Sequence, residues 1–252
     1  MNTLWPYLRI GAALLALAAL ARQLAREIAT AQAATTAWGR DIPTAVTNFF
    51  SFFTTLSGLI AALALLIGGA WMLRTKKQND TEPGWLAVLM TFASTYMLTT
   101  GIVYNILLRG IPSHAATEQW TSESLHVVLP TVMLVDVLFA PRRRAVGWGT
   151  AFTAVLFPLA WGGYTLIRGP FITDPFTATP FWYPYPFLNP HNEGGWPSVC
   201  VYFATIAVAI LVIAVIVVWI GRLRGTASRR PPGGMQRPQD ERTPTSAVAH
   251  RS

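Results

Sequence analysis

A threonine and a histidine on two separate apolar segments are the residues of this sequence whose types best suit chemistry. Thr54 lies seven residues after Thr47, near which one apolar segment begins, and His126 lies six residues after Trp120, near which another begins. If both segments enter a membrane as helices from the same side, the two side chains lie at depths of about 10 Å and about 9 Å. A hydroxyl and an imidazole at one level suggest nucleophilic catalysis, in which His126 accepts the proton of Thr54.

Nucleophilic catalysis also requires a group that orients the imidazole and donors that stabilise the developing oxyanion. Polar and aromatic residues near the same level supply the candidates for substrate binding: Tyr104, Asn105, Tyr183, Tyr185 and Phe187. No carboxylate lies at the right depth to orient the imidazole, and Glu118 and Glu123 are candidates only as residues of a loop or a helix entry. The orienting group therefore stays unassigned.

These features also have structural interpretations. Small residues at positions 47, 51, 54 and 58 fall on one helix face, a pattern typical of helix packing in membranes. His126 differs, because an ionisable residue inside a span is a functional candidate by default. Pro130, four residues later, cannot donate a hydrogen bond to the His126 carbonyl, so we expect the helix to open locally there. Asp136 is expected to cap its helix or to pair with the arginines at 142–144.

The histidines do not predict a metal site. His114, His126 and His191 are expected on the same side, but they lack the tight spacing of metal motifs, such as two histidines one helical turn apart. Cys200 is the single cysteine, so neither an intramolecular disulfide nor a cysteine metal site is available. We expect no cofactor and no metal ion.

The elements that must position these residues are apolar segments of membrane length. Of the 252 residues, 52% are hydrophobic and only 12% are charged, whereas a soluble domain carries roughly a quarter charged residues. The uncharged stretches 42–73, 83–108, 145–167 and 194–221 each reach or exceed the roughly 20 residues that cross a bilayer. We predict an all-α polytopic membrane protein, a six-transmembrane-helix bundle, with spans at about 4–21, 47–73, 85–108, 120–140, 146–167 and 198–220.

The first span has a second interpretation, as a cleaved signal peptide, because an apolar stretch at 10–21 precedes Ala-rich sequence. Arg9 is the only basic residue ahead of that stretch, and Arg22 and Arg26 follow it directly. A retained helix is therefore favoured. Cleavage would leave five spans in the same orientation.

Lys and Arg are distributed unevenly between the two sides of the predicted bundle. The side with both termini carries 14 basic residues and the other side carries 5. By the positive-inside rule, both termini are cytoplasmic, and Thr54 and His126 lie in the outer half of the cell (plasma) membrane. We assign 1–222 to the six-span domain and 223–252 to a disordered, basic cytoplasmic tail rich in Pro, Gly, Ser and Thr. Basic residues beside a span suit anionic lipid, and no nucleic-acid partner is expected.

Three segments occur in the order and spacing of a known family: FFSFFTTLS at 49–57, LHVVLP at 125–130 and YPYPFL at 183–188. They resemble the bacterial Pr6Pr family of six-span membrane proteins, which is similar to the androgen-induced protein family of eukaryotes. The resemblance extends from about residue 5 to residue 222. It implies a multi-pass hydrolase that cleaves fatty acid esters of hydroxy fatty acids, with His126 and a threonine as the catalytic residues. An ungapped match places the threonine at Thr54, with Thr55 as the adjacent alternative, and the family's extracellular Pro-Phe-Leu at 186–188.

The leading functional hypothesis is an integral-membrane hydrolase of a lipid acyl ester, which enters laterally from the outer leaflet. An apolar pocket with few polar groups is the expected site. The alternative is a non-catalytic lipid-binding or transport protein that uses the same cavity. Transport normally needs access from both faces, whereas here the polar residues lie on one side and no inverted repeat is visible. The expected partners are membrane lipids and a fatty-acyl ester substrate.

Overall fold

Six helical spans make up the described part of the protein. The computed structural model describes residues 3–75, 80–111 and 118–227, and within these ranges the regular structure is helical, with no strand. Six of the described helical segments are long and apolar enough to cross a membrane: Trp5–Ala33, Phe53–Arg74, Gly84–Leu108, Gln119–Phe139, Gly149–Phe171 and Gly195–Gly225. The predicted fold class, an all-α bundle of six spans, is confirmed.

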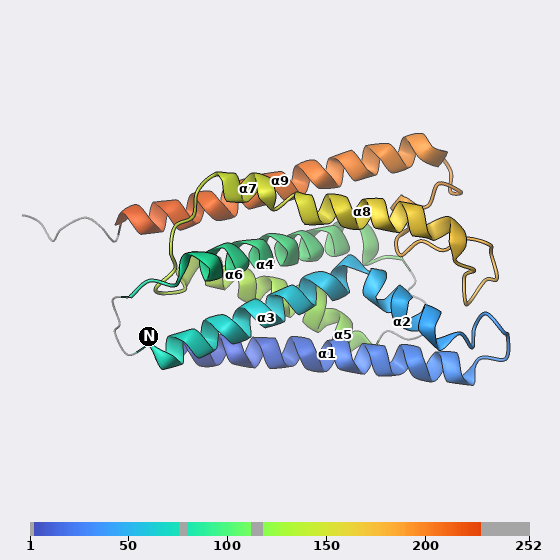
Figure 1. The fold of residues 1–252 in the computed structure, drawn as a ribbon, viewed down its shortest axis with the longest axis horizontal. Helices are drawn as coiled ribbons and strands as arrows, with labels where there is room; N and C mark the ends of the chain where they lie inside the picture. Colours follow the sequence, from blue (N-terminus) through green and yellow to red (C-terminus); the bar gives the residue numbers. More distant parts are fainter. Residues whose placement is uncertain (1–2, 76–79, 112–117, 228–252) are drawn as a thin grey trace, which may run out of the picture.

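The helices run alongside one another, and both ends of the described chain lie at the same end of the bundle (Figure 1). The first helix, α1 (Trp5–Ala33), begins at this end and the last helix, α9 (Gly195–Ala227), finishes there, on the opposite side of the bundle, and we call this the termini end. The opposite end, which we call the loop end, holds the start of α2 (Ile42–Ser51) and the segment 172–194.

Three of the spans contain irregular helix. The third span joins α4 to a π-helix, and the fourth joins α5, a second π-helix and α6, whereas the fifth consists of two α-helices and a final 3-10 turn. The remaining elements are α3 (Phe53–Arg74), α4 (Gly84–Val103), η1 (Tyr104–Leu108), α5 (Gln119–Glu123), η2 (Ser124–Val128), α6 (Leu129–Phe139), α7 (Gly149–Thr153), α8 (Leu156–Arg168), η3 (Gly169–Phe171) and η4 (Pro186–Leu188). The second predicted span is interrupted as well, between α2 and α3.

The first and last helices are longer than predicted. Helix α1 continues to Ala33 rather than ending near Ala21, because most of the residues at 22–33 are Ala, Gln, Arg, Glu or Leu, which favour helix. Helix α9 runs to Ala227, past the predicted domain boundary at 222, and Arg224 donates hydrogen bonds to the carbonyls of Val137 and Ala140. The rest of the predicted tail, 228–252, lies outside the described residues.

A break at Phe52 divides the segment that we predicted as one continuous span. Phe52 has an extended backbone (φ −73°, ψ 130°), so α2 ends at Ser51 and α3 begins at Phe53. The ring of Phe52 packs edge-on against Trp182 and Tyr185, at centroid distances of 5.7 and 5.6 Å. The predicted single face of small residues at 47, 51, 54 and 58 is therefore wrong, because aromatic contacts with the loop interrupt the helix.

A proline interrupts the fifth span in a way that a neighbouring helix compensates. Pro158 has no N–H for the carbonyl of Ala154, and α7 ends just before this point. The Tyr96 hydroxyl donates to that carbonyl instead, at 2.9 Å. The freed carbonyl is thus satisfied within the bundle, as backbone groups in lipid must be.

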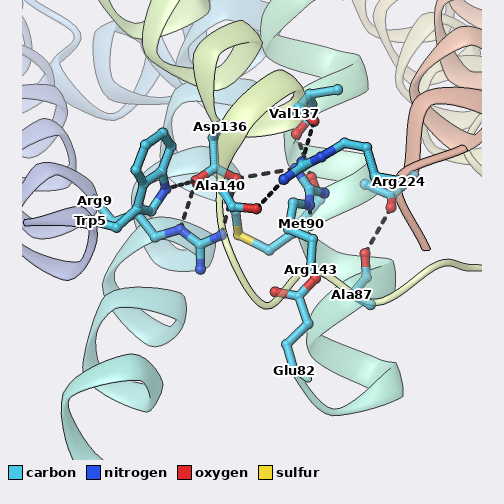
Figure 2. Close-up of polar contacts among 12 residues, drawn as sticks. Trp5, Arg9, Glu82, Ala87, Met90, Asp136, Val137, Ala140, Arg143 and Arg224 are labelled. Atoms are coloured by element: carbon cyan, nitrogen blue, oxygen red, sulfur yellow. Dashed lines mark hydrogen bonds and ion pairs between the residues drawn. The ribbon is translucent and has the colours of Figure 1, made fainter. Parts of the chain in front are cut away.

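A buried ionic cluster joins the helices at the termini end (Figure 2). Arg9 of α1, only 1% exposed, donates two hydrogen bonds to Asp136 of α6, at 2.7 and 3.1 Å. Trp5 donates to the same carboxylate at 2.9 Å and Arg143 at 3.1 Å. The predicted pairing of Asp136 with the arginines at 142–144 is confirmed for Arg143, while the partnership with Arg9 was not predicted.

Helix α1 belongs to the core of the bundle. Its alanines at 12, 13, 16 and 19 are buried against the α3 residues Ala61, Ala62 and Leu65. Small residues allow two helix backbones to approach closely in a membrane.

Candidate active site at the start of α3

The structure brings Thr54 and His126 into contact. The Oγ1 atom of Thr54 lies 3.2 Å from Nε2 of His126. Thr54 is the second residue of α3, immediately after the break at Phe52, and His126 lies in the π-helix η2. Thr54 is half-buried, whereas Thr55 and His126 are buried, at 3% and 8% exposure. The geometry therefore favours Thr54 over Thr55 as the hydroxyl that His126 reaches.

The imidazole of His126 is held by the backbone of its own helix. Its Nδ1 atom lies 2.9 Å from the carbonyl oxygen of Ser122, which can only accept a hydrogen bond. We therefore assign the ring proton to Nδ1, which leaves Nε2 as an acceptor facing the Thr54 hydroxyl. The orienting group that the sequence left unassigned is thus a main-chain carbonyl, which no side-chain pattern could have indicated.

The two glutamates considered as orienting groups have other partners. Glu118 accepts from Arg22 at 2.6 Å, and Glu123 accepts from Arg109 at 3.0 Å. The hydrogen bond from Arg22 lowers the pKa of Glu118 to about 2. Both carboxylates therefore serve ion pairs between helices.

Tyr104 supports the histidine from the neighbouring span. Its ring stacks on that of His126, with the centroids 3.7 Å apart and the planes 15° from parallel. Its hydroxyl lies 3.0 Å from Oγ of Ser122. Tyr104 opens η1 and His126 lies in η2, so two π-helical turns, a feature frequent at functional sites, face one another here.

Asn105 donates the hydrogen bond to the His126 carbonyl that Pro130 cannot donate. Because Pro130 lacks an N–H, it cannot donate to the His126 carbonyl, and the side-chain amide of Asn105 donates to that carbonyl at 3.1 Å. The same amide donates to the carbonyl of Gly101 at 2.7 Å, and its oxygen accepts from Arg109 at 2.8 Å. The predicted local opening at His126 is confirmed. Asn105, predicted to bind substrate, instead has its amide nitrogen engaged in holding η1 and η2 together.

The loop supplies a phenol to the site. The Tyr185 hydroxyl accepts a hydrogen bond from the backbone N–H of Thr54 at 3.3 Å and lies 3.4 Å from Thr54 Oγ1. Burial raises the pKa of the Tyr185 phenol, which therefore stays protonated at neutral pH. Its hydroxyl proton can therefore be donated to Thr54 Oγ1 or to a bound group beside it.

Of the other two aromatic candidates, Phe187 lines the cavity beside Thr54 and Tyr183 does not. Phe187 stacks on Tyr185, with centroids 5.1 Å apart, and lines the same cavity as Thr54. Tyr183 packs against Gly169 and has Phe181 at 6.4 Å. It is not among the described residues that line this cavity, so its predicted contact with substrate has no geometric support.

Thr54 lies at the wall of a narrow apolar cavity inside the bundle, with a volume of about 50 Å³. The walls come from α3, α4, η1, α8, α9 and the segment 185–188. The sequence did not indicate the contributions of α8 and α9, which include Pro158, Leu159, Trp161, Phe203 and Ile206. Tyr104 lines the cavity but His126 is not among its described wall residues. The hydroxyl therefore faces the cavity and the imidazole lies behind it.

The described histidines do not converge. No group of three His, Cys, Asp or Glu residues suited to a metal ion occurs in the parts of the chain that the structure describes. His191 stacks on Phe181 at 3.7 Å, while His126 contacts Thr54. His114, the third histidine considered, lies outside the described residues.

The fold and the site together define a class: a polytopic helical membrane protein with a threonine–histidine pair at the wall of an internal apolar cavity. Comparisons of the chain with protein-family models, with curated proteins and with solved structures found no match.

Proposed function

We propose that this chain is an integral-membrane hydrolase of lipid acyl esters, with Thr54 as the nucleophile and His126 as the general base. The observation that carries the proposal is the 3.2 Å separation of Thr54 Oγ1 and His126 Nε2 at the wall of an apolar cavity. A nucleophile and a base within hydrogen-bond distance, with the base oriented by a third group, form the arrangement that nucleophilic catalysis requires.

The reaction proceeds in two halves. Thr54 Oγ1 bonds to the ester carbonyl carbon as its proton passes to His126 Nε2, and the alcohol then leaves with that proton. This step gives an acyl-threonine. His126 next takes a proton from water, whose oxygen bonds to the acyl carbon, and the carboxylic acid leaves as Thr54 recovers its proton.

Two features of the site suit the negative charge that develops on the carbonyl oxygen. Thr54 lies in the first turn of α3, where the partial positive charge of a helix N-terminus favours an anion. Tyr185 accepts from the Thr54 N–H, so its own proton can bond either to Thr54 Oγ1, 3.4 Å away, or to the oxyanion. The break at Phe52 creates both features, because a continuous helix would have no N-terminus here.

The location of the site suits a substrate that arrives through the membrane. Leu159 both lines the cavity and is 40% exposed on the outside of the bundle, where lipid chains would contact it. The excess of basic residues at the termini end supports cytoplasmic termini in the cell membrane and a site in the outer leaflet. The resemblance to the Pr6Pr family agrees with the same assignment of Thr54 and His126.

Hydrolysis of p-nitrophenyl octanoate by the purified full chain in detergent tests the proposal. We expect turnover by the wild type, and losses of at least about 100-fold in Thr54→Ala and in His126→Ala. Thr55→Ala, the adjacent buried threonine, is the matched control and should keep its activity. Full activity in both Thr54→Ala and His126→Ala would refute the proposal. Tight binding of the ester without turnover would instead favour the non-catalytic lipid-binding alternative.

A further inference from the structure

A second, wider chamber lies at the loop end, beyond the cavity of Thr54. Its volume is about 470 Å³, and it lies between the end of η1, the loop residues 186–193 and the first turns of α9. Its polar wall residues are Asn189, Asn192, Glu193, Ser198 and Tyr202. The inner cavity, by contrast, is narrow and mostly apolar.

The two chambers adjoin. Thr54 lies on the wall of the inner cavity, part of the way along it. Leu108 and Phe187 line both of them. The hydrogen bond of 2.9 Å between Ser57 and Thr100 puts these residues at one level. Helices α3 and α4 run in opposite directions. The inner cavity therefore extends from Thr54 toward the termini end as far as Thr99, just past this level. Toward the loop end it extends as far as Leu108.

The inner cavity has the shape of a slot for a chain. Along α9 it extends from Phe203 to Ile210, about 10 Å at the helical rise. A narrow apolar slot of this length suits an unbranched aliphatic chain. An ester carbonyl at Thr54 then directs its remaining part into the outer chamber.

The outer chamber carries negative and no positive charge on its described walls. Glu193 is exposed and makes no hydrogen bond or ion pair within the described chain, and no Lys, Arg or His is among the described wall residues. Arg109, next to Leu108, donates to Glu123 and Asn105. A free carboxylate with nearby amides and hydroxyls accepts hydrogen bonds from hydroxyl groups and repels another carboxylate.

Resting on the proposed hydrolase function, we propose that the substrate is an acyl ester of an uncharged polyol such as glycerol. Its aliphatic chain occupies the inner cavity, and its hydroxyl groups occupy the outer chamber beside Glu193. An acyl ester of a hydroxy fatty acid, with its free carboxylate, is the disfavoured alternative. Glu193 thus acts as a specificity-determining residue.

The test separates binding from turnover. In the Thr54→Ala protein, the thermal stabilisation given by 1-octanoylglycerol is compared with that given by the octanoyl ester of 12-hydroxystearate. We expect tighter binding of the glycerol ester, and a Glu193→Lys change that shifts the ratio of the two affinities by about fivefold or more toward the anionic ester. Glu193→Gln should give an intermediate ratio, and added salt should reduce the differences. Glu241→Lys, the same charge change in the predicted tail, is the control.

Equal or tighter binding of the anionic ester, with a ratio that Glu193→Lys leaves unchanged, would overturn the inference. Hydrolysis of both esters by the wild type is measured in parallel. Selective binding of the glycerol ester without hydrolysis would refute the proposed enzyme while supporting the substrate chemistry. Hydrolysis with a preference for the anionic ester would support the enzyme and refute the substrate class.

Discussion

Removing Asp136 should destabilise the protein more than removing its main partner, Arg9. Within the described chain, both hydrogen bonds of the Arg9 side chain go to Asp136, and its Nη1 atom has no partner. Asp136→Leu therefore leaves a guanidinium that is 1% exposed without either of its two hydrogen bonds. In Arg9→Met, by contrast, the carboxylate keeps its hydrogen bonds from Trp5 and Arg143.

The magnitude follows from this asymmetry. Leaving one partner of a buried ion pair uncompensated costs about 3–5 kcal/mol, so we expect Asp136→Leu to reach that range and Arg9→Met to stay below it. At about 2–4 °C per kcal/mol for a chain of this size, Asp136→Leu lowers Tm by about 6–20 °C. The double variant should recover much of the loss, because it no longer buries an unpaired charge.

Thermal unfolding in detergent, followed by tryptophan fluorescence, measures these differences. Arg74→Met, an exposed arginine at the same end of the bundle, is the matched control and should change stability by no more than about 0.5 kcal/mol. Equal losses in the two single variants, with an additive loss in the double variant, would refute this explanation of the cluster.

Three further predictions concern the site and its surroundings. Tyr185→Phe should lower kcat by about 10²–10³-fold and should also lower Tm, because the Thr54 N–H loses its acceptor, and an unchanged kcat would remove Tyr185 from the oxyanion site. Asn105→Leu leaves the His126 carbonyl without its donor and should cost about 1–3 kcal/mol together with part of the activity, while an equal Tm and kcat would contradict its role. The pKa of Glu118 is lowered to about 2, so its ion pair with Arg22 contributes in full to the stability of the folded state above the ordinary carboxyl pKa of about 4.3. This small contribution is lost as the pH falls toward 2. Glu118→Gln should remove that part of the pH dependence of Tm.

Hydropathy and charge were sufficient to predict the six spans. The depth of Thr54 was calculated for a helix continuous from Thr47, and the break at Phe52 removes that premise, although Thr54 still contacts His126. Long uncharged stretches have few alternatives to membrane helices, and helical rise converts residue number into depth. Pro130 also identified the opening at His126, because a missing N–H is a local property of the sequence. These predictions required no knowledge of tertiary contacts.

The features that complete the site depend on tertiary contacts and on the backbone. Phe52 is neither glycine nor proline, and its break comes from packing against Trp182 and Tyr185. The group that orients His126 is the carbonyl of Ser122, and every residue type carries a carbonyl. The pairing of Arg9 with Asp136 joins residues 127 positions apart, which spacing along one helix cannot indicate.

Active-site labelling with a fluorophosphonate probe tests the central claim most directly. The purified wild type, Thr54→Ala, Thr55→Ala and His126→Ala are treated in parallel, and the labelled peptide is identified by mass spectrometry. We predict labelling at Thr54 in the wild type and in Thr55→Ala, and none in Thr54→Ala or His126→Ala. Labelling that persists at another residue in Thr54→Ala, or no labelling of folded wild type, would contradict the threonine–histidine site.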